Sequence, residues 1–315
     1  MTESPTDKPD RTGKAGGAAT LTAPDVRGVR LPDTMSGWRL TAREFVQNRL
    51  AVVGLGIIVF FVLFCFAGPY LYATDQVTVD PVSSLLAPGG GHPLGTDAQG
   101  FDVLGRIMLG GRASLQIGLF AALIATGIGT LYGTVAGLAG GAVDGFMMRV
   151  VDTLLSIPFL FIVLIVATRF SSTVLSLSLI LGAFSWLAPA RLVRAEVLTL
   201  RSRGFVAAAT VMGATKARIV ARHLIPNALG VVIVNITFQV ADAIIAVSLL
   251  GFLGFGLNYP DVEWGTQLSA GVSYLLAGSW WLIYPVGGCL VLVVMAFNFV
   301  GDALRDSIDV RLRRR

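Results

Sequence analysis

Charged residues are scarce in this chain of 315 residues. Asp, Glu, Lys and Arg make up only 14% of it, against about 25% of an ordinary soluble domain, whereas 54% of the residues are hydrophobic. This balance excludes an ordinary soluble domain. We therefore expect most of the chain to lie in a lipid bilayer.

Cysteine and histidine are also rare. The two cysteines, Cys65 and Cys289, fall inside apolar runs, which excludes a disulfide framework. The two histidines, His92 and His223, fall in segments that we expect on opposite sides of the membrane, so they cannot share one catalytic site. We expect no catalytic residue in this chain.

Metal and phosphate motifs are missing as well. His92, Asp97 and Asp102 lie near one another in sequence, but they lack the compact spacing of metal ligands. The stretch "GTDAQGFD" lacks the Lys and the Ser or Thr that a phosphate-binding loop uses to reach phosphate and magnesium. We expect no metal site, no bound cofactor and no ATP hydrolysis by this chain alone.

What the chain does contain is a set of six long apolar runs. A helix needs about 20 apolar residues to cross a bilayer, and continuous runs favour helices over the alternating strands of a barrel. The predicted fold is an all-α membrane protein with six transmembrane helices, at residues 50–73, 115–139, 147–168, 174–190, 229–256 and 280–302. The fourth run is diluted by serines and by Pro189.

The positive charges predict the orientation of these helices. All 24 Lys and Arg residues except Arg106, Arg112 and Arg169 fall in segments that share the side of the N-terminus. Cations are enriched in cytoplasmic loops, so we expect both termini in the cytoplasm of a bacterial cell and a multi-pass protein in its inner membrane.

The segments outside the spans differ in composition. Residues 1–35 have the composition of a disordered cytosolic tail, and residues 36–49 resemble an amphipathic helix on the membrane surface. We expect an extracytoplasmic segment with an interfacial helix at 74–114, a permease core at 115–302 with a cytoplasmic loop at 191–228, and a basic cytosolic C-terminus at 303–315.

One polar stretch, "FVAAATVMGATKARIVARHLIPN" at residues 205–227, stands between two apolar runs. Its alanines favour a helix, Gly213 can end that helix in the left-handed conformation, and Thr215 can cap a second one. Arg218 and Arg222 share one face of this second helix. A solvated basic loop would need neither caps nor an ordered turn. The pattern therefore predicts a docking element for a cytosolic partner.

The same stretch carries a resemblance to a known family. Ala207, Ala208, Ala209, Gly213, Ala214, Ile225 and Pro226 fit the coupling loop of ABC importer permeases. From about Trp38 the chain resembles the C-type permease subunit of dipeptide and oligopeptide importers, on stretches such as "FVQNRLAVVGL", "DGFMMRVVDTLLSIP" and "LLGFLGFGL". The resemblance covers about 270 residues and implies that the ATPase-coupling residues are those seven together with Arg218 and Arg222.

Two positions depart from that family. Ala207 replaces a glutamate of the coupling loop, and Val247 replaces a glutamate that often precedes the "SFLGLG"-like segment. An exposed ion pair is worth about 0–1 kcal/mol, so docking can use Arg218, Arg222 and apolar contacts instead. Asp242 lies five residues before Val247, and an acid inside a span is a candidate pathway residue, with a structural role left open.

The resemblance also implies partners. They are a B-type permease subunit that forms a heterodimer with this chain, two cytosolic ATPase subunits that bind ATP and Mg, and an extracytoplasmic substrate-binding protein. Residues 74–114 and 257–279, with Trp264, are the candidate surfaces for the binding protein.

Several alternatives stay open at this stage. The same architecture could carry nickel, haem or glutathione instead of peptides. A channel or secondary carrier would need an ion site within one chain, where Asp242 is almost the only buried acid expected. A membrane-tethered DNA-binding regulator is disfavoured because spans on both sides hold the helix pair at the membrane, so we expect no nucleic-acid partner.

Overall fold

Helices form the regular structure of the chain throughout the residues that the computed structural model describes, which are 45–219, 222 and 224–313. They are α2 (Arg49–Phe66), α3 (Gly68–Leu71), η1 (Pro81–Ser83), α4 (Val103–Ala139), α5 (Gly141–Leu155), α6 (Phe159–Ala167), α7 (Val174–Ser185), α8 (Leu187–Arg201), α9 (Gly204–Val211), α10 (Lys216–Ile219), α11 (Ile225–Phe252), α12 (Trp264–Leu275), η3 (Trp280–Leu282) and α13 (Tyr284–Arg313). The expected all-α architecture is confirmed for this part of the chain.

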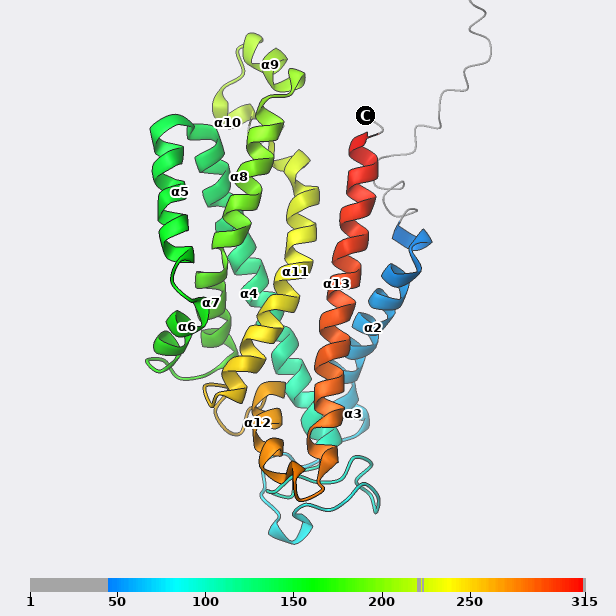
Figure 1. Ribbon diagram of the computed structural model, residues 1–315. Helices are drawn as coiled ribbons and strands as arrows, with labels where there is room; N and C mark the ends of the chain where they lie inside the picture. The colour runs from blue at the N-terminus through cyan, green and yellow to red at the C-terminus, as the bar shows by residue number, and fades with distance from the viewer. Residues whose placement is uncertain (1–44, 220–221, 223, 314–315) are drawn as a thin grey trace, which may run out of the picture. The chain divides into compact units, whose positions relative to one another are not determined.

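The long helices run side by side between two ends (Figure 1). We call the end that carries α9, α10 and the last turns of α13 the α9 end, and the end that carries α12 and the loop before α4 the α12 end. Within the described residues, four helices are long and apolar enough to cross a membrane: α2, α4, most of α11 and the stretch Trp280–Ile308. The bent pairs α5–α6 and α7–α8 bring the possible spans to six, as predicted.

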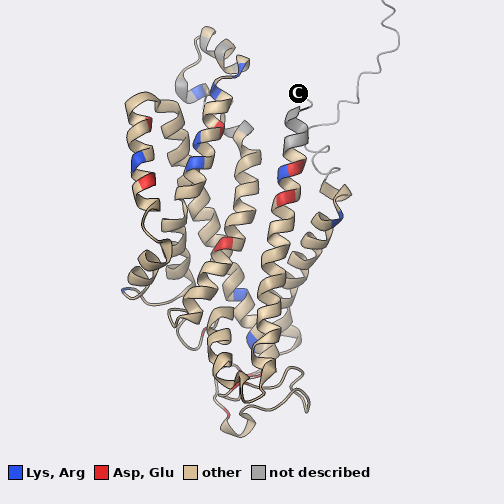
Figure 2. Ribbon diagram, in the orientation of Figure 1, with Lys and Arg blue, Asp and Glu red and all other residues tan. Residues whose placement is uncertain are grey.

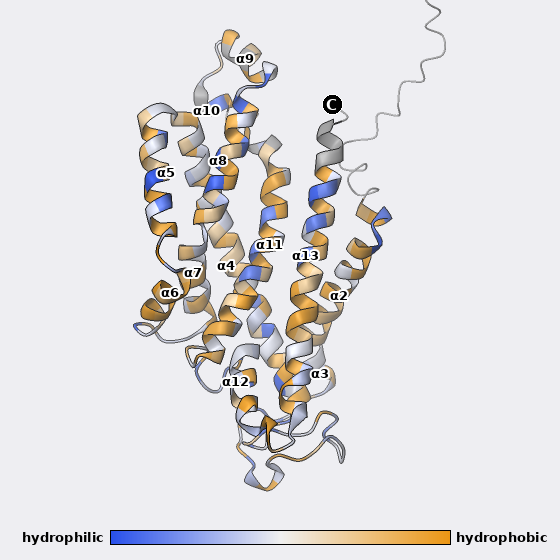
Figure 3. Ribbon diagram, in the orientation of Figure 1, coloured by the Kyte–Doolittle hydropathy of each residue, from blue (hydrophilic) through white to orange (hydrophobic). Residues whose placement is uncertain are grey.

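Hydropathy and charge follow this arrangement. Apolar residues cover most of α2, α6 and α11, while hydrophilic residues gather on α5, α8 and the last part of α13 (Figure 3). Lys and Arg lie mostly toward the α9 end (Figure 2).

The first span begins at a clear cap. Asn48 accepts hydrogen bonds through Oδ1 from the backbone N–H groups of Leu50 (3.0 Å) and Ala51 (3.4 Å), which starts α2 at Arg49. Residues 45–47 are helical, whereas the predicted tail 1–35 and most of the predicted surface helix 36–49 lie outside the described residues. α2 ends at Phe66, before the expected end at residue 73. Pro69, near the start of the one-turn helix α3 that follows, has no N–H with which to continue the hydrogen bonds of α2.

The helix α4 differs from the prediction of a separate interfacial helix. It runs without a break over 37 residues, so the residues expected in a separate interfacial helix are the first turns of this long helix. Asp102 caps it by accepting a hydrogen bond from the N–H of Gly105 at 2.9 Å. Val103 and Ile107 are buried in the bundle, which holds these first turns away from a membrane surface.

The third and fourth spans are bent, which the apolar runs 147–168 and 174–190 do not show. α5 and α6 meet at 75° around Pro158, and α7 and α8 meet at 46° before Pro189. Proline explains both bends, because it lacks an N–H donor and its ring clashes with the preceding turn. α8 also continues to Arg201, so the first residues of the predicted loop 191–228 are helical.

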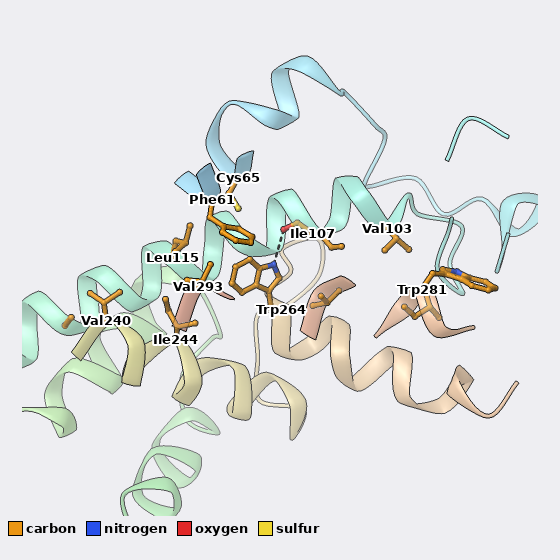
Figure 4. Packing of buried hydrophobic residues seen from close by; sticks show 13 residues of the cluster. Phe61, Cys65, Val103, Ile107, Leu115, Val240, Ile244, Trp264, Trp281 and Val293 are labelled. Carbon is orange, nitrogen blue, oxygen red and sulfur yellow. Dashed lines mark hydrogen bonds between the residues drawn. The ribbon is translucent and has the colours of Figure 1, made fainter. Parts of the chain in front are cut away.

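Trp264 at the start of α12 organises the core at the α12 end (Figure 4). Its indole Nε1 donates to the Ile107 carbonyl of α4 at 3.1 Å, and its backbone N donates to Ser114 Oγ at 3.2 Å. The Phe61 ring of α2 meets the indole edge-on, with 6.1 Å between centroids. One side chain thus joins three helices.

Close backbone contact joins α4 to α8. Gly129, Gly133 and Gly137, four residues apart, form one stripe of α4 that faces α8. A Cβ on Gly133 would collide with the carbonyl oxygen of Ala190. Small residues allow such approach where no hydrophobic force drives helices together.

This contact predicts that Gly133→Ala lowers the thermal unfolding midpoint of the detergent-purified protein. Forcing a methyl group against the backbone of a neighbouring helix costs about 1–3 kcal/mol. Gly127 is the matched control, because it lies in the same helix with nothing within 4 Å of a Cβ, so Gly127→Ala should leave the midpoint unchanged or raise it. Equal midpoints for the two variants would contradict the close contact between α4 and α8.

Candidate functional site

A cavity of about 450 Å³ lies where the two bent spans meet α11. Its wall includes the α5–α6 connection, the α7–α8 connection and one face of α11, and its lining residues are Leu154, Leu155, Ile157, Pro158, Phe159, Ile162, Ala183, Phe184, Ser185, Trp186, Leu187, Ala188, Gln239, Asp242, Ala243 and Ala246. Interrupted helices at membrane depth are tolerated where they line a cavity or lie within protein. This cavity is therefore the candidate pathway.

A polar contact satisfies the backbone at the α7–α8 bend. Pro189 has no N–H to give to the carbonyl of Ser185, four residues earlier. Gln239 of α11 supplies the missing donor, because its Nε2 donates to that carbonyl at 3.1 Å. The bend is thus fixed to α11 by a hydrogen bond that borders the cavity.

Asp242 lies three residues after Gln239 on α11 and also lines the cavity. Its side chain is exposed, and within the described part of the chain it accepts no hydrogen bond. This position suits the predicted pathway residue. The pathway role, a pair with the partner subunit and a structural role all stay predictions for Asp242.

The loop between α8 and α11 has the predicted local geometry. α9 ends before Gly213, whose φ is 79°, in the left-handed region. The N–H of Ala214 donates to the Ala209 carbonyl at 3.0 Å, as in a glycine-terminated helix. Thr215 Oγ1 accepts from the N–H of Arg218 at 3.4 Å and caps α10. The predicted first helix, the glycine turn and the start of the second helix are present, while the second helix as predicted, 216–224, includes residues outside the described part.

A small core fastens this loop to the spans. Val206 and Ala209 of α9 and Ile219 of α10 are buried together with residues of α8 and α11; the other buried members of this cluster are Val193, Val197, Leu200, Leu224 and Ala228. α9, α10 and α8 therefore form one packed body rather than a loose loop.

The outer surface of the same loop is apolar at its tip. Val211 is 88% exposed and Met212 is 81% exposed, directly before the Gly213 turn. Arg218 and Arg222, farther along the same loop, are also exposed. Exposed aliphatic side chains at the tip of an ordered loop are suited to contact with another protein.

The remaining predicted coupling residues belong to the same segment and differ in exposure. Ala208 and Pro226 are exposed and Ala214 is half-buried. The backbones of Ala207 and Ile225 belong to α9 and α11, while their side chains lie outside the described residues.

Comparison with known proteins gives the family. The model of the binding-protein-dependent transport system inner membrane component matches residues 129–314. The chain belongs to this family. The N-terminal part of the permease, residues 36–88, matches the N-terminal TM domain of oligopeptide transport permease C. It is a multi-pass inner-membrane permease.

Named relatives resemble the permease over almost its whole length. The oligopeptide transport system permease protein OppC of Escherichia coli is 41% identical over 278 residues, 88% of this chain and 92% of its own. OppC of Haemophilus influenzae is 38% identical over 88% of this chain and 89% of its own. The dipeptide transport system permease protein DppC of Bacillus subtilis is 36% identical over 93% and 90%.

Two ion pairs join α5 to α8 of the permease, and sequence reasoning missed them. Arg194 donates to both carboxylate oxygens of Asp144, from Nε at 2.5 Å and from Nη2 at 2.6 Å. Arg191 pairs with Asp152 farther along the same two helices. The sequence did contain two acids on one amphipathic segment and two arginines on another. It did not indicate that these two segments lie side by side or which acid contacts which arginine. They tie α5 to the helix that carries the α9–α10 loop.

A buried acid at the α12 end was also missed. Glu263 is fully buried and caps α12 by accepting from the N–H of Thr266 at 3.0 Å, and its carboxyl also accepts from the Thr266 hydroxyl. Burial raises the pKa of Glu263 to about 7, against the lowering effect of hydrogen bonds from backbone N–H groups. An acid three residues before Thr266 in "EWGT" was the signal for a cap.

The neighbouring Trp264 corrects an expectation. It has no exposed surface in this chain, so it cannot belong to a docking surface at 257–279. Trp281 is likewise buried, and its Nε1 donates to the Thr96 carbonyl at 3.2 Å, whereas Trp280 is half-exposed.

The three residues considered as metal ligands contact other side chains. His92 Nδ1 lies 2.9 Å from Asp102 Oδ2, and Asp97 forms an ion pair with Arg106.

The cavity predicts water access at Asp242. A thiol reacts with a charged methanethiosulfonate reagent only where water lets it ionise, so Asp242→Cys should react more than about tenfold faster than Ala241→Cys. Ala241 is the matched control because it is the adjacent residue and is 1% exposed. The permease without an added cysteine measures the background from Cys65 and Cys289. Equal rates at 241 and 242 would contradict a wetted cavity.

Proposed function

We propose that this chain is the C-type permease subunit of an ATP-driven importer of dipeptides or oligopeptides and forms half of its translocation pathway. The supporting observation is the 34–41% identity to named oligopeptide and dipeptide permeases over most of the chain. Those names favour peptides over nickel, haem or glutathione. The cavity at the helix breaks is the part of the pathway that this chain would contribute.

The proposed orientation places the α9 end in the cytosol. Arg191, Arg194, Arg201, Arg203, Arg218 and Arg222 all lie at or near that end, as expected of a cytoplasmic face. The α12 end would then face the extracytoplasmic binding protein, over the described loop before α4 and the exposed parts of 257–279.

The proposed assembly has four further chains. A B-type permease subunit completes the pathway, two cytosolic ATPase subunits bind ATP and Mg, and the binding protein delivers the substrate. The permease itself is not catalytic in this scheme, because its sequence carries no phosphate-binding loop.

Coupling would begin at the exposed tip of the α9–α10 loop. Val211 and Met212 are suited to a cleft of the ATPase, with Arg218 and Arg222 farther along the same loop. Closure of the ATPase pair on ATP would move this tip, and the core under α9 and α10 would move α8 with it. The Asp144–Arg194 pair would carry α5 along, so both walls of the cavity would shift as packed bodies.

The first test is recovery of the tagged chain from its native membrane in mild detergent. The proposal expects a second permease and ATPase chains in the same fraction, with ATP hydrolysis stimulated by the loaded binding protein. A chain that is recovered alone and moves solute without ATP would instead be a carrier or channel.

The exposed tip predicts the effect of a charge there. Val211→Asp should cut the recovery of ATPase chains at least about tenfold, since burying an unpaired carboxylate at an apolar contact costs several kcal/mol. Leu276→Asp is the matched control, because Leu276 is 100% exposed at the opposite end. Full ATPase recovery with Val211→Asp would exclude the tip as the docking surface.

The glycine turn predicts a separate defect. Gly213→Val forces a β-branched residue to a φ of 79°, which costs about 1–2 kcal/mol and should reorient the tip. ATP-dependent uptake should fall while the amount of protein in the membrane is kept. Gly56→Val controls for bulk, because a Cβ at Gly56 meets nothing within 4 Å. Normal uptake by the Gly213 variant would count against rigid coupling through this turn.

A further inference from the structure

Two adjoining cavities at the α12 end share one arginine. One has a volume of about 280 Å³ and lies between the start of α4, α12 and the start of α13. The other has a volume of about 410 Å³ and lies between the loop before α4 and the segment that leads into α12. Both are lined by Asp97, Gln99, Arg106, Gln267 and Ala270.

The Arg106 guanidinium is held in place between these cavities. Its Nε lies 3.5 Å from Asp97 Oδ2, and its Cζ lies 4.0 Å from the centre of the Phe101 ring. Asp97 is itself fixed, because its Oδ1 accepts from the backbone N–H groups of Gln99 and Phe101, each at 2.9 Å. The Gln267 amide donates to the Arg106 carbonyl at 2.7 Å. The guanidinium is therefore preorganised by its neighbours.

This guanidinium keeps unused donors. It carries five N–H groups, and Asp97 is its one ionic partner among the described residues, reached through Nε. Asp97 is also the one acid in either lining, again among described residues. The terminal Nη groups therefore remain available to a planar acceptor, although the Arg106 side chain is only 12% exposed.

The walls around the arginine are mixed. Val103, Leu282 and Val286 line the smaller cavity, and Val79 and Val262 line the larger one. Gln99 and Gln267 bring amides to both. Such walls suit an amphipathic group that carries amides and an aliphatic side chain beside its charge.

We propose that Arg106 binds the C-terminal carboxylate of the peptide on the outer side of the membrane, with the last side chain of the peptide in one of the two cavities. The inference rests on the proposed peptide importer. A carboxylate fits the two parallel donors of the guanidinium end, and its single charge meets less repulsion from Asp97 than the double charge of a phosphate would. The ligand class is thus a peptide with a free C-terminus.

The test uses the complete transporter in nanodiscs, with Gln99→Cys in this chain as a reporter. Gln99 is exposed and lines both cavities, so a bound peptide should slow its modification by a charged maleimide. The probes are trialanine and trialanine amide, added without the binding protein. Ala87→Cys is the matched control, because Ala87 is exposed on the same loop and lines neither cavity.

The proposal expects trialanine to protect residue 99 at a concentration at least about tenfold lower than trialanine amide, since a charge-assisted pair is lost with the amide. Arg106→Gln should remove this difference, whereas Arg169→Gln, which alters an exposed arginine at the same end, should keep it. Because the acid-to-amide comparison needs no change at Arg106, it stands even if the Arg106 variant fails to fold.

Other outcomes overturn the inference. Equal protection by the acid and the amide would exclude a carboxylate site. A parallel reaction contains the binding protein and no peptide; protection of residue 99 there, with none by trialanine alone, would make Arg106 a docking residue for that protein. Wild-type transporter that takes up no peptide with ATP would refute the proposed function instead, which is a separate result from equal protection in a transporter that does.

Discussion

Backbone hydrogen bonding within hydrocarbon is the constraint on which this architecture depends. Lipid offers no partner to a free carbonyl, so a proline inside a span needs a donor from a neighbouring helix. Gln239 meets that need for the carbonyl that Pro189 leaves without a partner. The bend, the cavity beside it and the position of α11 are consequences of one local loss of a donor. Gln239, which lines the cavity, thereby also stabilises the bend.

Close packing around α4 completes the arrangement. The glycine stripe of α4 brings α8 to backbone contact, and Trp264 joins the opposite end of α4 to α2 and α12. α4 therefore has close contacts at both of its ends. α5 is attached to α8 by two ion pairs whose side chains are partly exposed. Of the helices that line the cavity, α7, α8 and α11 each pack directly on α4.

The sequence predicted the features that depend on neighbouring residues. The helix pair around Gly213 and the cap at Thr215 follow from local propensity, and the structure has them. The length of α4 was missed because Asp102, Arg106 and Arg112, spaced between apolar residues, gave its first turns the pattern of an interfacial helix. The burial of Trp264 depends on α2 and α4, more than 100 residues away in sequence, and periodicity does not report such contacts. The Glu263 carboxylate packs against Gly251 at the end of α11 and Gly256 of the turn that follows it, and this turn was not predicted. Likewise, sequence spacing does not predict that Asp97 pairs with Arg106 or that both residues line two cavities.

The continuity of α8 has a mechanical consequence. Its first residue lines the cavity and its last turn packs against the loop beside α9, over 15 residues, or about 22 Å of helix. A tilt of about 10° at one end of a rod of that length displaces the other end by about 4 Å. A movement of that size is about the width of a side chain, so a small tilt of α8 at the α9 end would be enough to change the width of the cavity about 20 Å away.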